Sequence, residues 1–155
     1  MCLFRKYTPD SVDQGLNVPN YLDLISRNIA ANVLIAVIVA VHYAVKQGDK
    51  YSLKTLLDNL SHKQRVQPLF TQDRDGNTAL HEATLQGQTE TVKTLLDNVA
   101  PEQQLQLLPV KNRKSNTASQ EASGRFGTTD TMRTLEHYQI AANYKVNYRK
   151  TVKFT

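Results

Sequence analysis

The chain repeats itself at a fixed interval of 39 residues. Residues 42–60 read HYAVKQGDKYSLKTLLDNL, and residues 81–99 read HEATLQGQTETVKTLLDNV, with ten of nineteen aligned positions identical. A weaker third copy follows at the same offset, because Asn77-Thr78-Ala79 returns as Asn116-Thr117-Ala118 and Glu82-Ala83 returns as Glu121-Ala122. A constant period of about 20–50 residues is typical of a solenoid, in which each unit buries its apolar face only against its neighbours.

Length and composition fit one helical domain that is held together without disulfide bonds. The 155 residues suffice for one core. A single cysteine, Cys2, excludes an internal disulfide framework. The apolar stretch Ile29–Val45 contains Asn32 and His42 and is shorter than the roughly 20 apolar residues that a membrane span needs. Since its end aligns with the start of copy two, we expect it to supply the first helix of copy one and not to enter a membrane.

Basic residues are concentrated at the C-terminal end of the chain. Residues 1–110 hold ten Lys/Arg and eleven Asp/Glu, whereas residues 111–155 hold nine and three. Within residues 139–155, aromatic and basic side chains alternate in a way that could contact nucleic acid or an anionic surface. A disordered end and an extended strand covering the last repeat are the two other interpretations of this tail.

Copy two can be interpreted locally as a turn followed by two antiparallel helices. Asp73–Asn77 is predicted to be a turn in which Gly76 takes positive φ. A short helix over residues 79–86 should end at Gly87, and Thr89 should cap a second helix. Residues 61–70 and 100–110 are predicted to contain a further short helical connector after each pair, with Pro101 at the start of one.

The segment Asp73–Ala83, DRDGNTALHEA, resembles an ankyrin repeat. Asp73, Gly76, Thr78, Leu80, His81, Ala83, Gly87, Val92, Leu95 and Leu96 fit the family pattern, and Ala79 replaces its Pro. The resemblance implies a hydrogen bond between Thr78 and His81. Departures are the period of 39 instead of about 33, an apolar sequence in place of the first turn, and Ser119 and Gln120 in place of the Leu and His of copy three. Gly127 aligns with Gly87 only after a one-residue insertion.

We therefore expect an all-α, ankyrin-like helix-turn-helix solenoid of about three repeats with short helical connectors. The predicted organisation is an irregular or helical lead-in at 1–28, a repeat domain at 29–138 with copies near 38–60, 73–99 and 112–138, and a basic aromatic tail at 139–155. No catalytic or metal-binding constellation is found: the His81-Glu82 pair has Leu85 where a zinc protease has its second His, and a calcium loop would need an acid at Thr71. No cofactor is predicted.

The resemblance implies a non-enzymatic protein-binding module whose partner contacts turn tips and first helices. The candidate contact residues are Arg74, Asp75, Asn77, Leu85, Gln86, Arg113, Lys114, Asn116, Arg125 and Phe126, with Lys46 and Gln47 at the matching places in copy one. The resemblance also implies a cytosolic setting, including a host cytosol if the protein is a delivered effector. The alternative is a binder of nucleic acid or an anionic surface through the basic C-terminal third.

Overall fold

The computed structural model describes the backbone of residues 18–126 and 130–153 and the side chains of residues 31–124 and 130–153. The chain divides into two compact units, Met1–Ile35 and Ala36–Thr155. The described part of the first unit is the beginning of helix α1, Val18–Gln47. Within it, Val33 and Ile35 are exposed.

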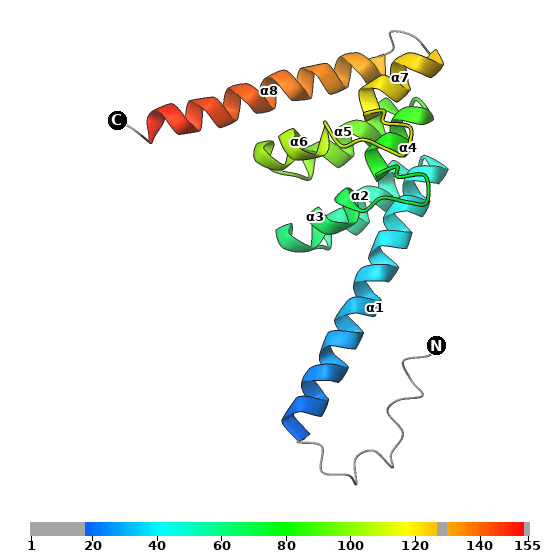
Figure 1. Cartoon of the computed structure of the whole chain (residues 1–155), viewed down its shortest axis with the longest axis vertical. Helices are drawn as coiled ribbons and strands as arrows, with labels where there is room; N and C mark the ends of the chain where they lie inside the picture. Colours follow the sequence, from blue (N-terminus) through cyan, green and yellow to red (C-terminus); the bar gives the residue numbers. More distant parts are fainter. Residues whose placement is uncertain (1–17, 127–129, 154–155) are drawn as a thin grey trace. The chain divides into compact units, whose positions relative to one another are not determined.

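The second unit contains the end of α1 and every other described helix (Figure 1). No strand occurs among the described residues. The helices are α2 (Lys50–Asp58), α3 (His62–Phe70), α4 (Ala79–Leu85), α5 (Thr89–Asp97), α6 (Pro101–Leu107), α7 (Ala118–Phe126) and α8 (Asp130–Val152). Helix α4 packs against α5 and α7 against α8, and the end of α1 and α2 share the same buried core. The expected all-α, ankyrin-like solenoid of about three repeats is confirmed.

The two glycines that recur at the 39-residue offset end the first helix of copies one and two in the same way. Gly48 has φ +69° and Gly87 has φ +67°, in the left-handed region that glycine adopts without a steric penalty. In copy two, the amides of Gly87 and Gln88 donate to the carbonyls of Thr84 and Ala83, which closes the helix end. Each first helix therefore turns back into its partner after the same short connection.

In copy two, helix α5 begins one residue earlier than the sequence suggested. Gln88 is the capping residue of α5, and Thr89 is the first residue of the helix. The prediction that Thr89 caps α5 is therefore wrong. Its hydroxyl instead lies 2.8 Å from that of Thr131, the first residue after Asp130 in α8, and so joins two successive repeats.

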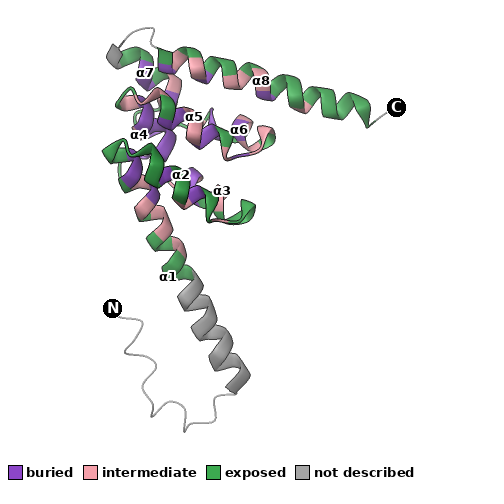
Figure 2. Ribbon diagram, turned by 180° about the vertical axis from the view of Figure 1, so that it is seen from behind, coloured by how far each residue is buried: buried purple, intermediate pink, exposed green. Residues whose placement is uncertain are grey.

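The extra residues of the 39-residue period form α3 and α6, as predicted. Gln64 and Gln103, which recur at the same offset, each accept a hydrogen bond at Oε1 from the amide that precedes the helix: Ser61 at 2.9 Å and Ala100 at 3.1 Å. Figures 1 and 2 show both connectors projecting on the same side of the stack. The side-chain amide of buried Gln104 also donates to the Leu96 carbonyl at 2.8 Å, which fixes α6 to the end of α5.

The core follows the repeated apolar positions through the stack. Buried residues concentrate in α4, α5 and the adjoining parts of α1 and α2, and α8 becomes exposed toward its C-terminal end (Figure 2). The fully buried large side chains include Val41, Val45, Leu53, Leu57, Leu80, Val92, Leu95, Leu96, Leu107 and Leu135. Because several of these residues lie at equivalent places, as do Leu53 and Val92 or Leu57 and Leu96, the buried apolar surface is continuous from one repeat to the next.

The predicted tail is helical as far as Val152. The alternatives of a disordered end and an added strand are therefore wrong over residues 139–152. Ala142 is fully buried, and the Arg149 guanidinium lies 2.9 Å from the Glu102 carboxylate of α6, so packing extends well beyond residue 138. The division of the chain at residues 28 and 138 stays a prediction.

Candidate functional site: the stacked turns

The turn of copy two is held by one carboxylate. Oδ1 of Asp73 accepts hydrogen bonds from the backbone amides of Asp75 and Asn77, both at 2.9 Å. Gly76 has φ +76°, as predicted. A side-chain oxygen that bonds to the backbone two and four residues ahead fixes the turn from within.

In the turn of copy three, the side chain of Asn112 takes the place of the Asp73 carboxylate. Oδ1 of Asn112 accepts from the amides of Lys114 at 3.0 Å and Asn116 at 3.1 Å, repeating the pattern of Asp73. Ser115 occupies the position of Gly76 and has φ +64°, which is unusual for a residue with a side chain. Both turns therefore have the same backbone shape despite different sequences.

Hydrogen bonds join the two turns side by side. The Arg113 amide donates to the Asp75 carbonyl at 3.0 Å. The side-chain amide of Gln72 donates to the Lys111 carbonyl at 2.9 Å. We call residues 72–77 and 111–116 the turn strip; it is a rigid surface because each turn is bonded both within itself and to its neighbour.

A buried polar network lies beneath the turn strip. Nδ2 of Asn112 donates to Oδ1 of Asn77 at 3.0 Å and to Oε1 of Glu121 at 2.6 Å. Asn116 also donates to Glu121, at 3.2 Å. The hydrogen bond from Asn112 is the main reason that the pKa of Glu121 lies below its usual value, despite the burial of this carboxylate.

Thr78 and His81 make the hydrogen bond that the sequence resemblance implied. The Thr78 hydroxyl lies 2.9 Å from Nδ1 of His81, and the Thr78 amide donates to the same nitrogen at 3.3 Å. Because an amide can only donate, Nδ1 accepts and Nε2 carries the hydrogen. Nε2 then donates to the Asn116 carbonyl at 3.1 Å, which connects α4 to the next turn. Burial lowers the pKa of His81, which favours this neutral form.

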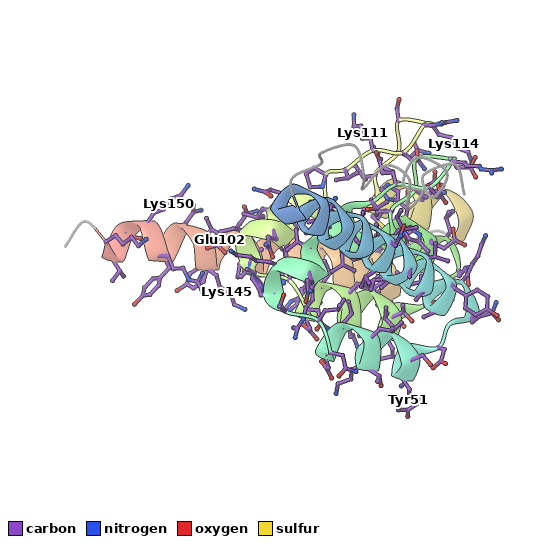
Figure 3. The ribbon with its side chains drawn as sticks, turned by 90° about the horizontal axis from the view of Figure 1, so that it is seen from below. Tyr51, Glu102, Lys111, Lys114, Lys145 and Lys150 are labelled. Atoms are coloured by element: carbon purple, nitrogen blue, oxygen red, sulfur yellow. The ribbon has the colours of Figure 1, made fainter. Side chains whose placement is uncertain are left out.

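The tips of the turn strip carry exposed charges. Arg74 and Asp75 are exposed in copy two, and Lys111, Arg113 and Lys114 are exposed in copy three. Lys111 and Lys114 point outward from this end of the unit (Figure 3). Within the described part of the chain, no ion pair forms with the three basic residues of copy three. One turn is thus of mixed charge and the next is basic.

The structure brings together only some of the predicted contact residues at the surface. Arg74, Asp75, Arg113, Lys114 and Gln86 are exposed, and Leu85 is half-buried. Asn77 is buried and Asn116 is half-buried, and both side chains belong to the network beneath the strip. The predicted contacts Arg125 and Phe126 have side chains outside the described residues.

Sequence reasoning missed the bridging role of Asn112 and an open groove between α5 and α8. The recurrence of Glu82 as Glu121 was the available signal for the role of Asn112.

The groove between α5 and α8 has a volume of about 800 Å³ and mixed charges on its walls. There the Tyr138 hydroxyl donates to Asp97 at 2.5 Å, and burial raises the pKa of this phenol. No sequence pattern pointed to this pair.

Among the described residues, no group of three or more His, Cys, Asp or Glu could hold a metal ion. None of the helices in the described ranges is both long and apolar enough to cross a membrane.

Comparison with known proteins agrees with the geometry of the paired helices and stacked turns. A family model described as ankyrin repeats (many copies) matches residues 41–96. This part of the chain is similar to ankyrin repeats. The match includes the end of α1, α2, α3, α4 and most of α5. Comparison with curated proteins found no match. Ankyrin repeats are in general protein–protein interaction modules, and their stacking forms extended binding surfaces.

Proposed function

We propose that this protein is a non-enzymatic binding module that holds a protein partner against the turn strip and the exposed ends of the first helices. The observation that carries the proposal is the pair of hydrogen bonds between the turns, Arg113 to Asp75 and Gln72 to Lys111. A surface that is already ordered loses little conformational freedom on binding, so its contacts contribute more of their energy to affinity.

Charge at the tips supports a protein partner with a matching pattern. Lys111, Arg113 and Lys114 project from copy three, whereas the tip of copy two offers Arg74 beside Asp75. Complementary charge across an interface steers association and selects among partners. We propose that the partner places an acidic segment on the third turn, and that Leu85 and Gln86 of α4 contact the same partner.

We also place the module in the cytosol, including the cytosol of a host cell if the protein is a delivered effector. This setting is part of the proposal and rests on the kind of module alone. The alternative function, nucleic-acid or anionic-surface binding through the basic C-terminal third, draws on the exposed lysines of α8 and is separated from the first by the experiment below.

The test is affinity capture with the intact chain, an Arg113→Glu/Lys114→Glu variant and a Lys54→Glu/Lys63→Glu control. All four residues are exposed, and the control pair lies on α2 and α3, so both variants change the net charge equally. We expect a protein that is captured by the intact chain and by the control but lost with the turn variant. Equal loss with both variants, or capture of nucleic acid alone, would contradict the proposal.

A further inference from the structure

Helix α8 carries a row of exposed apolar and aromatic side chains at a spacing of four residues. Ile140, Tyr144, Tyr148 and Val152 are 70%, 71%, 60% and 54% exposed. The rings of Tyr144 and Tyr148 lie stacked, with centroids 6.3 Å apart. We call these four residues the α8 row.

The packing of α8 leaves most of this row turned away from the repeats, although Ile140 also borders a hollow that Leu108 and Pro109 line. Leu135 and Ala142 are buried, and Arg149 pairs with Glu102 of α6. Successive residues of an α-helix are about 100° apart, so Ile140 lies roughly 160° around the helix from Ala142. The row therefore begins on the side opposite the packed face, and it is not core surface of the three repeats.

From His137 onward, the charges beside the row have one sign; Glu136, one turn before Ile140, is the last acidic residue in the described part of α8. No acidic residue occurs from His137 to Lys153, whereas Lys145, Arg149, Lys150 and Lys153 occur there. Arg149 is neutralised by Glu102. Lys145 and Lys150 are exposed and point to opposite sides of the helix (Figure 3). Basic side chains thus flank the row, and a second copy of the same helix would be repelled from it.

We propose that the α8 row is a second docking surface, and that its occupant is an amphipathic helix with an apolar face bordered by acidic residues. Side chains four residues apart form a ridge, and such ridges pack into the grooves of another helix in the commonest class of helix crossing. The flanking lysines select acidic borders on the partner. This surface is separate from the turn strip, so the inference does not depend on the function proposed above.

The aliphatic ends of the row favour a helix over a nucleic-acid strand. Bases stack on the faces of aromatic rings, which Tyr144 and Tyr148 could supply. Ile140 and Val152 offer no such face, but they extend the apolar contact along three turns of α8. A protein helix uses all four residues, whereas a nucleic acid uses two.

The test uses a fluorescein-labelled helical peptide of about five turns with Leu along one face and Glu on both borders. Anisotropy is measured with the full chain, with Tyr144→Ala/Tyr148→Ala, and with Lys145→Gln/Lys150→Gln. The matched control is Tyr51→Ala, because Tyr51 of α2 is 76% exposed and lies 5.5 Å from the ammonium of Lys50. Circular dichroism checks that all four proteins have equal helicity.

We expect each α8 variant to weaken binding roughly tenfold or more, and Tyr51→Ala to leave it unchanged. A peptide with Lys in place of Glu should bind at least about tenfold more weakly. Equal binding of a scrambled acidic peptide, or no effect of the tyrosine variant, would overturn the proposal. Tighter binding of an oligouridylate than of the peptide would also overturn it, in favour of nucleic acid.

Discussion

The amide nitrogen of Arg113 lies 3.0 Å from the carbonyl oxygen of Asp75, so the backbones of two turns 38 residues apart in the chain are in direct hydrogen-bonded contact. This contact is possible only because the residue after Asp75 has no side chain. A Cβ atom built on Gly76 would lie 2.7 Å from that same nitrogen. Gly76 is therefore needed for the stacking of the turns as well as for its positive φ.

Replacing Gly76 by Ala should destabilise the protein by about 2–3 kcal/mol, since it adds a backbone clash to the cost of a left-handed conformation. The matched control is Gly87→Ala, where φ is also positive but no atom lies within 4 Å of the added Cβ. We expect Gly87→Ala to cost only about 1 kcal/mol. Urea denaturation of both variants measures the difference, and equal costs would contradict the stacking role of Gly76.

Replacing Ser115 by Gly should stabilise the protein by about 0.5 kcal/mol, because glycine relieves the positive φ of 64° at a small entropic cost. Ser123, exposed within α7, provides the opposite control. There the same substitution should destabilise by about 0.5–1 kcal/mol, since glycine weakens a helix interior. Thermal melts of the two variants should shift in opposite directions; a shift of the same sign would count against strain at Ser115.

Replacing Asn112 by Asp should destabilise the protein by about 2–3 kcal/mol at neutral pH. The change removes two donated hydrogen bonds and places a carboxylate beside buried Glu121. The difference in the free energy of unfolding between this variant and the parent protein should shrink as the pH falls toward about 4, because the carboxylates then take up a proton. Asp73→Asn is the control: its Oδ1 can still accept both amides of the turn, so a loss as large as that of Asn112→Asp would be unexpected.

Replacing His81 by Gln should remove part of the pH dependence of stability. Burial lowers the pKa of His81 in the folded protein, so its contribution is complete above the unfolded value of about 6.5 and is lost as the pH falls through the folded pKa. The chain supplies a precedent for glutamine, since Oε1 of Gln120 accepts from the Thr117 amide at 2.9 Å. Urea midpoints at several pH values between 8 and about 5 test this, with His62→Gln at exposed His62 as the matched substitution for comparison.

Much of the fold could be predicted because the repeat places the same local signals at the same offset. Gly87 ends α4 and Pro101 begins α6, each by short-range chemistry that a sequence exposes, and the hydrogen bond between Thr78 and His81 is the one that the family resemblance implied. The helical conformation of residues 139–152 could not be predicted in this way. It goes with the ion pair between Arg149 and Glu102, which lie far apart in the sequence, and with the burial of Ala142.

The candidate site was predictable in its location but not in its composition. Arg74 and Arg113 reach the tips as expected, because turn residues at matching positions project alike. Asn77 and Asn116 occupy similar tip positions in the sequence, yet their amides point inward to Asn112 and Glu121. Which polar side chain of a turn is displayed and which is buried is decided by hydrogen-bond partners on the adjacent repeat, and a single repeat read alone does not contain them.

The use of Asp73 in one turn and Asn112 in the next has a consequence for how the array is assembled. Asn112 holds its own loop through Oδ1 and donates through Nδ2 to Asn77 and to Glu121. An Asp at that place, as in the Asp73 turn, could still hold the loop but could not donate to the Glu121 carboxylate. Copies two and three are therefore not interchangeable at their turns, even where their helices share apolar positions.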